Sequence, residues 1–172
     1  MAGLGHLAKR FFGSLLPLGP RRADAAWALE HLTPGEQALW ARMSKVDRRH
    51  AAGVARRASA TLADQATREV VADALLHDVG KVESRLGTFA RVAATVVAAA
   101  AGRERAEAWA GGRGVQRRIA VYLRHPELGA ELLRGAGSDP VTVAWAAEHH
   151  LPEVRWTLPR NVATALKAAD DD

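Results

Sequence analysis

The segment Leu75-Leu76-His77-Asp78-Val79-Gly80-Lys81 lies near the middle of a sequence of 172 residues. It ends an apolar helical pattern that begins at Thr67 and whose expected inward residues are Val70, Val71, Ala74 and Leu75. Gly80 is expected to let the chain leave the helix. An imidazole and a carboxylate are both good ligands for a divalent metal, and a helix end can present them to a common pocket. The doublet therefore predicts part of a metal site.

Further candidate ligands lie on both sides of the doublet. They are His50 before it, and His125, His149, His150 and Asp170 after it. Each lies at or near the end of an expected helix or on its inward face, and a helical bundle can bring such positions into one cleft. Imidazoles and carboxylates together form a mixed nitrogen and oxygen site for one or two divalent ions, with Fe, Mn, Zn, Co, Ni and Mg as candidates. Such a site can polarise a phosphoryl oxygen and supply hydroxide at neutral pH.

His50 shows why no single residue is decisive. It shares a helix face with Val54 and Ala58, and Asp47 is a suitable N-cap for that helix. A lone histidine on an apolar face is more often a core or boundary residue than a metal ligand. Only partners in space would make His50 a ligand.

Length and composition indicate one helical domain. The chain is long enough to bury a core, and 48% hydrophobic residues with only 5% aromatics suit closely packed, alanine-rich helices. No segment alternates with a period of two, no repeat recurs, and there is no glycine-rich phosphate loop. The absence of cysteine excludes disulfides, thiolate ligands and cysteine nucleophiles. It is compatible with a reducing cytoplasm, where we expect the protein.

Start signals and apolar spacing predict the individual helices. Thr33-Pro34-Gly35-Glu36 is a capping box with proline at the first helical position, and Asp139-Pro140 is a second strong start. A long buried helix is expected from Leu86 to about Trp109, with an inward face of Phe89, Val92, Ala93, Val96, Val97 and Ala100. Further helices are expected at 67–77, 115–123, 127–133, 141–149 and 160–169. We expect an all-α bundle over residues 33–172, preceded by a basic N-terminal segment and linker over residues 1–32.

The N-terminal segment has two distinct sides. On a helix over residues 3–16, one side carries Leu4, Leu7, Phe11 and Leu15, and the other carries Lys9 and Arg10. The segment is too short and too charged to span a bilayer, and it resembles no secretory signal. It could rest weakly on a membrane surface, or it could be a helix that docks on the domain or frays, and these interpretations stay open.

Positive charge is concentrated in the first third of the chain. Residues 1–60 carry a net charge of +6, whereas the whole chain carries +5. Such a surface could face phosphates, but aromatic residues are not interleaved among the charges as in proteins that bind single strands. No specific nucleic-acid motif is recognised, and a solvated arginine-rich surface is the simpler interpretation.

These residues resemble those of a known family, the HD-domain metal-dependent phosphohydrolases. The similarity covers about Asp47 to Asp170 and follows the family's order of ligands. His50 resembles the upstream histidine, His77-Asp78 resembles the signature doublet, and Asp170 resembles the distant aspartate. Asp171 or Asp172 would take that last place if the helical register differed by one or two residues. The resemblance implies an HD helical bundle with a metal site between helices.

The similarity extends to the branch of the family with two or more metals, which includes the HD-GYP cyclic-dinucleotide phosphodiesterases. His125-Pro126-Glu127-Leu128-Gly129 is similar to its His-Pro-x-x-Gly element, and Glu148-His149-His150 is similar to its double-histidine element. By this resemblance His125, His149 and His150 would hold a second ion, and Asp78 would bridge the two. The residues after His150 lack Gly-Tyr-Pro, which weakens cyclic di-GMP as a substrate.

The resemblance implies a metal-dependent phosphohydrolase that acts on a nucleotide or another phosphate mono- or diester. Asp78 and Lys81 would be its catalytic residues, with Lys81 paired to a substrate phosphate, and Arg85 and Arg124 are further candidates for phosphate contact. The alternative is a non-catalytic HD-type signalling or nucleotide-binding module. The missing Gly-Tyr-Pro element and the basic N-terminal arm motivate that alternative.

Overall fold

The computed structural model describes residues 19–172, apart from the side chains of Thr88, Ala99, Arg103, Glu104 and Glu107. The regular elements of this part of the chain are all helical, which confirms the predicted all-α class. The longer helices are α2 (Arg22–Glu30), α3 (Pro34–Arg42), α4 (Lys45–Leu62), α5 (Arg68–Leu76), α7 (Thr88–Ala101), α9 (Gly114–Leu123), α10 (His125–Gly135), α11 (Pro140–Glu148) and α12 (Arg160–Asp171). Shorter elements are α6 (Lys81–Ser84), α8 (Arg103–Ala108) and 3-10 turns at Ala63–Gln65, Trp109–Gly111 and Glu153–Arg155.

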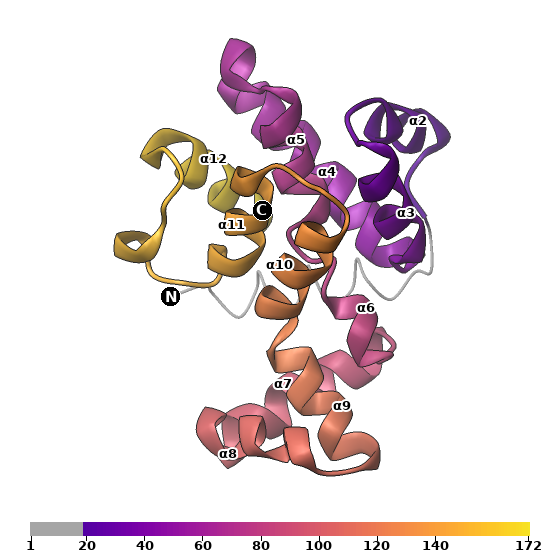
Figure 1. Ribbon diagram of the computed structural model, residues 1–172, viewed down its shortest axis with the longest axis vertical. Helices are drawn as coiled ribbons and strands as arrows, with labels where there is room; N and C mark the ends of the chain where they lie inside the picture. Colours follow the sequence, from indigo (N-terminus) through magenta and orange to yellow (C-terminus); the bar gives the residue numbers. More distant parts are fainter. Residues whose placement is uncertain (1–18) are drawn as a thin grey trace.

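The helices form two groups, each packed around its own apolar cluster. The main core forms where α4, α5, α10, α11 and α12 pack on one another, and its largest fully buried side chains include Trp145, Leu75, Leu76, Leu133 and Leu166. A smaller cluster around Leu86, Ala94 and Ile119 holds α7, α8 and α9 together. Figure 1 shows this second group at the opposite end of the molecule from α2 and α5.

The helix starts follow from local hydrogen bonds. Thr33 and Glu36 form the predicted capping box, and Asp139 caps α11 before Pro140. The prediction for α4 was wrong, because Ser44, not Asp47, is its N-cap. Asp47 lies three residues later, donates its backbone N–H to the Ser44 hydroxyl, and accepts from that hydroxyl through its carboxylate. Its carboxylate is therefore directed by Ser44 and by the ion pair described below.

The expected long buried helix from Leu86 to Trp109 is wrong in two respects. Gly102, at φ +85°, separates α7 from α8. The face of α7 that was expected to be inward is exposed, with exposed fractions of 64% for Val96, 42% for Val97 and 40% for Val92. Among the described side chains of α7, Ala94 and Ala98 are the buried ones, because small side chains allow the helix to lie close to its neighbours.

Gly80 has a different role from the predicted one. Its φ of −62° is ordinary for a right-handed helix, so no glycine is needed to turn the chain there. A Cβ at this position would lie 2.0 Å from the carbonyl oxygen of His125 and 2.6 Å from the backbone N of Gly129. Glycine is required because the chain after α5 presses directly against the first turns of α10.

The N-terminal region is helical from Arg22. In α2, Ala28 is fully buried in the main core, and Trp27 receives the guanidinium of Arg56 over its ring at 3.8 Å. The core therefore reaches back into the range 1–32 that was expected to precede the domain. The amphipathic segment at 3–16 lies outside the described residues. Between residues 19 and 172 no helix has the length and apolar character needed to cross a membrane.

Candidate metal centre

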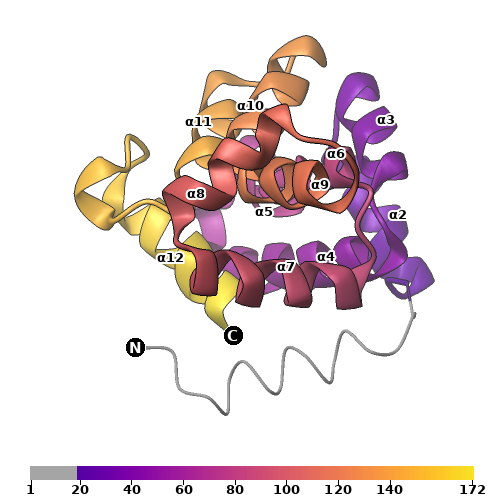
Figure 2. The same cartoon turned by 90° about the horizontal axis from the view of Figure 1, so that it is seen from below.

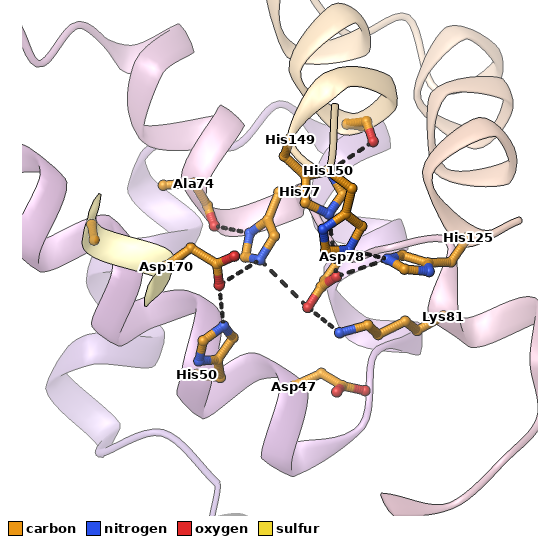
Figure 3. Close-up of polar contacts among 12 residues, drawn as sticks. Asp47, His50, Ala74, His77, Asp78, Lys81, His125, His149, His150 and Asp170 are labelled. Atoms are coloured by element: carbon orange, nitrogen blue, oxygen red, sulfur yellow. Dashed lines mark hydrogen bonds and ion pairs between the residues drawn. The ribbon is translucent and has the colours of Figure 1, made fainter. Parts of the chain in front are cut away.

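The predicted ligands come together from five helices. His77 and Asp78 follow directly on α5, His125 is the first residue of α10, and His149 and His150 follow directly on α11. His50 comes from α4 and Asp170 from the last turn of α12. Figure 3 shows these side chains converging on one space between the helices. The five helices meet here because α4 and α11 both pack on α5, α12 packs on α4, and α10 packs on α11.

Three of the imidazoles are oriented in the same way. The Nδ1 atoms of His77, His125 and His149 lie 2.9, 2.8 and 2.9 Å from the carbonyl oxygens of Ala74, Tyr122 and Ala146, each three residues earlier. A carbonyl can only accept, so each Nδ1 carries a proton and donates it. Each Nε2 then points into the shared space. This outer hydrogen bond is the arrangement that holds metal-binding histidines in the correct tautomer.

Asp78 lies between two groups of imidazoles. Its Oδ1 atom lies 3.3 Å from His125 Nε2 and 3.7 Å from His149 Nε2, whereas its Oδ2 atom lies 3.4 Å from His77 Nε2. The ammonium of Lys81 contacts Oδ2 as well. The carboxylate is almost fully buried, so its position is set by these partners.

A second carboxylate completes the other side of the site. Asp170 Oδ1 lies 2.9 Å from His50 Nε2 and 3.6 Å from His77 Nε2. Asp170 is the aspartate that faces the site: it is buried, whereas Asp171 is exposed and pairs with Lys167, and Asp172 is exposed too. The register that the sequence left open is therefore decided in favour of Asp170.

The donor set fits divalent metal ions. The Nε2 atoms of His77 and His149 are buried and have no hydrogen-bond partner among the described residues, a costly state for a polar atom unless another group binds there. Two sets of ligand atoms lie within 4.8 Å of one another, namely Asp78 with His125, His149 and His150, and Asp78 with His50 and His77. Bonds of about 2.1 Å from a tetrahedral ion place its ligands roughly 3.4 Å apart, close to the separations around Asp78. The protein thus has two overlapping sets of residues that could hold a divalent ion, with Asp78 common to both.

Electrostatics keeps the carboxylates ionised and most imidazoles neutral. Burial raises the pKa of Asp78, but the Lys81 ammonium and the His77 ring outweigh it and hold the pKa well below its usual range. The hydrogen bond with His50 and the charge of the nearby His77 ring likewise outweigh burial and lower the pKa of Asp170. Burial, with the neighbouring His149 and His125 rings, lowers the pKa of His150 to about 2. Ionised carboxylates and neutral imidazoles are the forms that bind metals.

His77 is the exception among the imidazoles. Burial alone lowers its pKa, but Asp78 and Asp170 on either side outweigh that effect and raise the pKa to about 10. Without a metal, His77 therefore carries a proton that neutralises part of the surrounding negative charge. A divalent cation between the same carboxylates would supply that positive charge and release the proton.

Two neighbours of the site were not expected from the sequence to have this role. Asp47 lies on α4 near Lys81, where it adds to the larger effect of Asp78 in raising the lysine pKa against the effect of burial, and it pairs with Arg91 of α7 at 2.7 Å. Tyr122 stacks on His125 with ring centroids 5.6 Å apart and provides the carbonyl that orients it. Asp47 precedes His50 by three residues, a helical spacing that places both on one face and could have indicated its position. No local sequence pattern indicates that Tyr122 lies at the site.

The remaining candidates for phosphate contact differ in position. Lys81 is largely buried at the site, whereas Arg85 and Arg124 are exposed. Lys81 therefore has the strongest structural link to the candidate metal centre.

Comparisons with protein-family models, with curated proteins and with solved structures found no match for this chain.

Proposed function

We propose that this protein is a metal-dependent phosphohydrolase of the HD type that hydrolyses a nucleotide or another phosphate mono- or diester. The observation that carries the proposal is the placement of Asp78, whose Oδ1 atom faces the buried rings of His125 and His149 and whose Oδ2 atom faces the buried ring of His77. Carboxylates shared between two ions are typical of sites that hydrolyse phosphate esters. The order and type of these candidate ligands also resemble those of the HD-domain phosphohydrolases.

Each group has a defined task in this proposal. His50, His77 and Asp170 would hold one ion, His125, His149 and His150 would hold a second, and Asp78 belongs to both sets of candidate ligands. Bound divalent ions supply Lewis-acid polarisation of a phosphoryl oxygen and lower the pKa of water. Lys81 balances the charge of Asp78 and lies where it can turn to a phosphate oxygen. Asp47, paired with Arg91, keeps a negative charge near the lysine and so helps retain its proton.

The test combines metal analysis with an activity panel. The full chain is purified, loaded with Fe, Mn, Co, Ni or Zn, and assayed against phosphatase and phosphodiesterase substrates, including nucleotides. We expect one or two ions per chain and turnover with at least one metal. His149→Ala should lose metal and activity together, whereas His31→Ala, a histidine of the C-cap of α2 that hydrogen-bonds to Trp27, should lose neither.

The outcomes separate the two candidate functions. Bound metal and nucleotide without turnover would favour a non-catalytic nucleotide-binding module. A chain that binds no divalent metal at micromolar concentrations would contradict both the centre and the hydrolase.

A further inference from the structure

Helix α7 has two opposite faces of unequal burial. At 100° per residue, Arg91, Ala94, Ala98 and Ala101 lie on one side, and each of them is buried or half-buried. Val92, Val96 and Val97 lie on the other side and are exposed by 40% to 64%. Both sides are apolar over most of their length, although only one packs on the fold. A helix that is apolar all round is normally covered on both sides.

The position of α7 limits what can cover it. Arg91 in its first turn pairs with Asp47 in the first turn of α4 at 2.7 Å. Gly19, the first described residue, lies beside the same end of α4, since a Cβ on it would be 3.7 Å from Cβ of Lys45. The eighteen residues before Gly19 therefore join the fold close to the start of α7. Figure 2 shows α7 at the outer edge of the described chain, on the side of α4.

The preceding chain matches this face in length and in pattern. Residues 3–16 number fourteen, as does α7, and a helix of that length is about 21 Å long. Their apolar residues Leu4, Leu7, Phe11 and Leu15 recur at helical spacing, with Lys9 and Arg10 on the opposite side. Docked by its apolar side, the segment would leave both charges in water.

We propose that residues 3–16 form a helix that packs antiparallel to α7 and covers the face formed by Val92, Val96 and Val97. The direction follows from the point of attachment, because the carboxyl end of the segment must lie near the first turn of α7. Leu7 then lies opposite Val96 and Val97.

The geometry favours this occupant over a second copy of the chain. One helix face of about 21 by 10 Å offers roughly 200 Å², well below the roughly 800 Å² per partner of a stable interface. A tethered segment has no such requirement, because its effective concentration is high.

Disulfide trapping in the full chain tests the contact directly, because the sequence has no cysteine. In the variant with Leu7→Cys and Val96→Cys, a mild oxidant should form an intramolecular disulfide within the monomer. The matched control pairs Lys9→Cys with Val96→Cys, which places the first thiol on the charged side of the segment. We expect the Leu7 pair to oxidise at least tenfold faster than the control. Equal rates would overturn the proposal.

A second measurement is independent of disulfide geometry. Leu7→Asp with Phe11→Asp changes only residues of the segment, so the domain itself should fold, and α7 amides should exchange at least fivefold faster than in the wild type. Lys9→Asp with Arg10→Asp is the control and should leave α7 exchange unchanged. Disulfide-linked dimers of Val96→Cys alone as the main product would assign the face to a second copy. If the wild type pellets with anionic vesicles, and its α7 amides are protected from exchange only when vesicles are present, the exposed face of α7 would be assigned to a membrane. Either result would overturn intramolecular docking.

Discussion

The carboxylate of Asp78 and the imidazole of His125 meet at 3.3 Å across the contact between the end of α5 and the start of α10. The contact is possible because Gly80 and Gly129 let the two backbones approach closely. His125 is turned toward Asp78 by its Nδ1 hydrogen bond to Tyr122. The helix contact and the candidate metal centre therefore depend on the same few residues, and the predictions below separate their contributions.

Replacing Asp78 by Asn should remove the group common to both metal positions while keeping its shape. Removal of even an outer hydrogen-bond partner of a ligand costs about 10- to 100-fold in metal affinity or activity, so loss of this carboxylate should cost at least about 100-fold. Elemental analysis should show the metal content per chain reduced. A variant with wild-type metal content and turnover would contradict the role of Asp78.

Metal binding should strengthen with pH. His77 has a pKa of about 10 without metal and is protonated at pH 6 to 8, whereas a bound ion requires its neutral form. Binding should therefore release one proton from His77, and affinity should rise about tenfold per pH unit in this range. Burial lowers the pKa of His50, His149 and His150, so these rings should contribute less to the proton release than His77. Calorimetry in buffers of different ionisation enthalpy measures the proton count, and an affinity independent of pH would contradict the prediction.

Asp73 should make the fold less stable as pH rises. It is fully buried in α5, and this burial outweighs the opposing effect of the nearby Thr142 hydroxyl and, with a smaller contribution from the charge of Asp139, raises the pKa of Asp73 to about 7. The native state therefore holds a proton that the unfolded chain loses near pH 4. The stabilisation by protonated Asp73 is fully present below pH 4 and is lost as pH rises to about 7. Over this range the free energy of unfolding should fall by at most about 4 kcal/mol.

The substitution Asp73→Asn should remove the fall in stability that Asp73 causes as pH rises. The variant should unfold at higher urea concentration than the wild type at pH 8, and the difference should shrink toward pH 5. The protein should be studied free of metal, so that ligand binding does not contribute. A variant that is less stable than the wild type at pH 8 would show that the Asp73 carboxylate is paired in solution.

Gly80→Ala should disturb both the helix contact and the metal centre. The added Cβ would lie 2.0 Å from the His125 carbonyl oxygen, so backbones must move, at a cost of about 1–3 kcal/mol or more. The displaced His125 should also lower metal occupancy. Gly135→Ala near the end of α10 is the matched control, because nothing lies within 4 Å of its Cβ. The control should be neutral or up to about 1 kcal/mol more stable, since alanine favours a helix. Equal unfolding midpoints for the two variants would contradict the close contact.

Features that depend only on neighbouring residues could be predicted from the sequence. The capping box at Thr33 and Glu36, the N-cap at Asp139 and the helix that ends at His77 are local hydrogen bonds and local spacing, and the structure confirms them. The candidate ligands could also be selected, because histidines and aspartates at helix ends are visible in the chain. Their order suggested one site, although only by resemblance.

Tertiary packing decided the rest. The exposure of Val96, the need for glycine at position 80 and the pairing of Asp47 with Arg91 all depend on which helix lies alongside, and no local pattern specifies that. The same is true of the site: the rings of His77, His125 and His149 face Asp78 because the helices that carry them pack together. Helix propensity and spacing act over a few residues, whereas these contacts join residues up to 120 positions apart, as in the pair of His50 and Asp170.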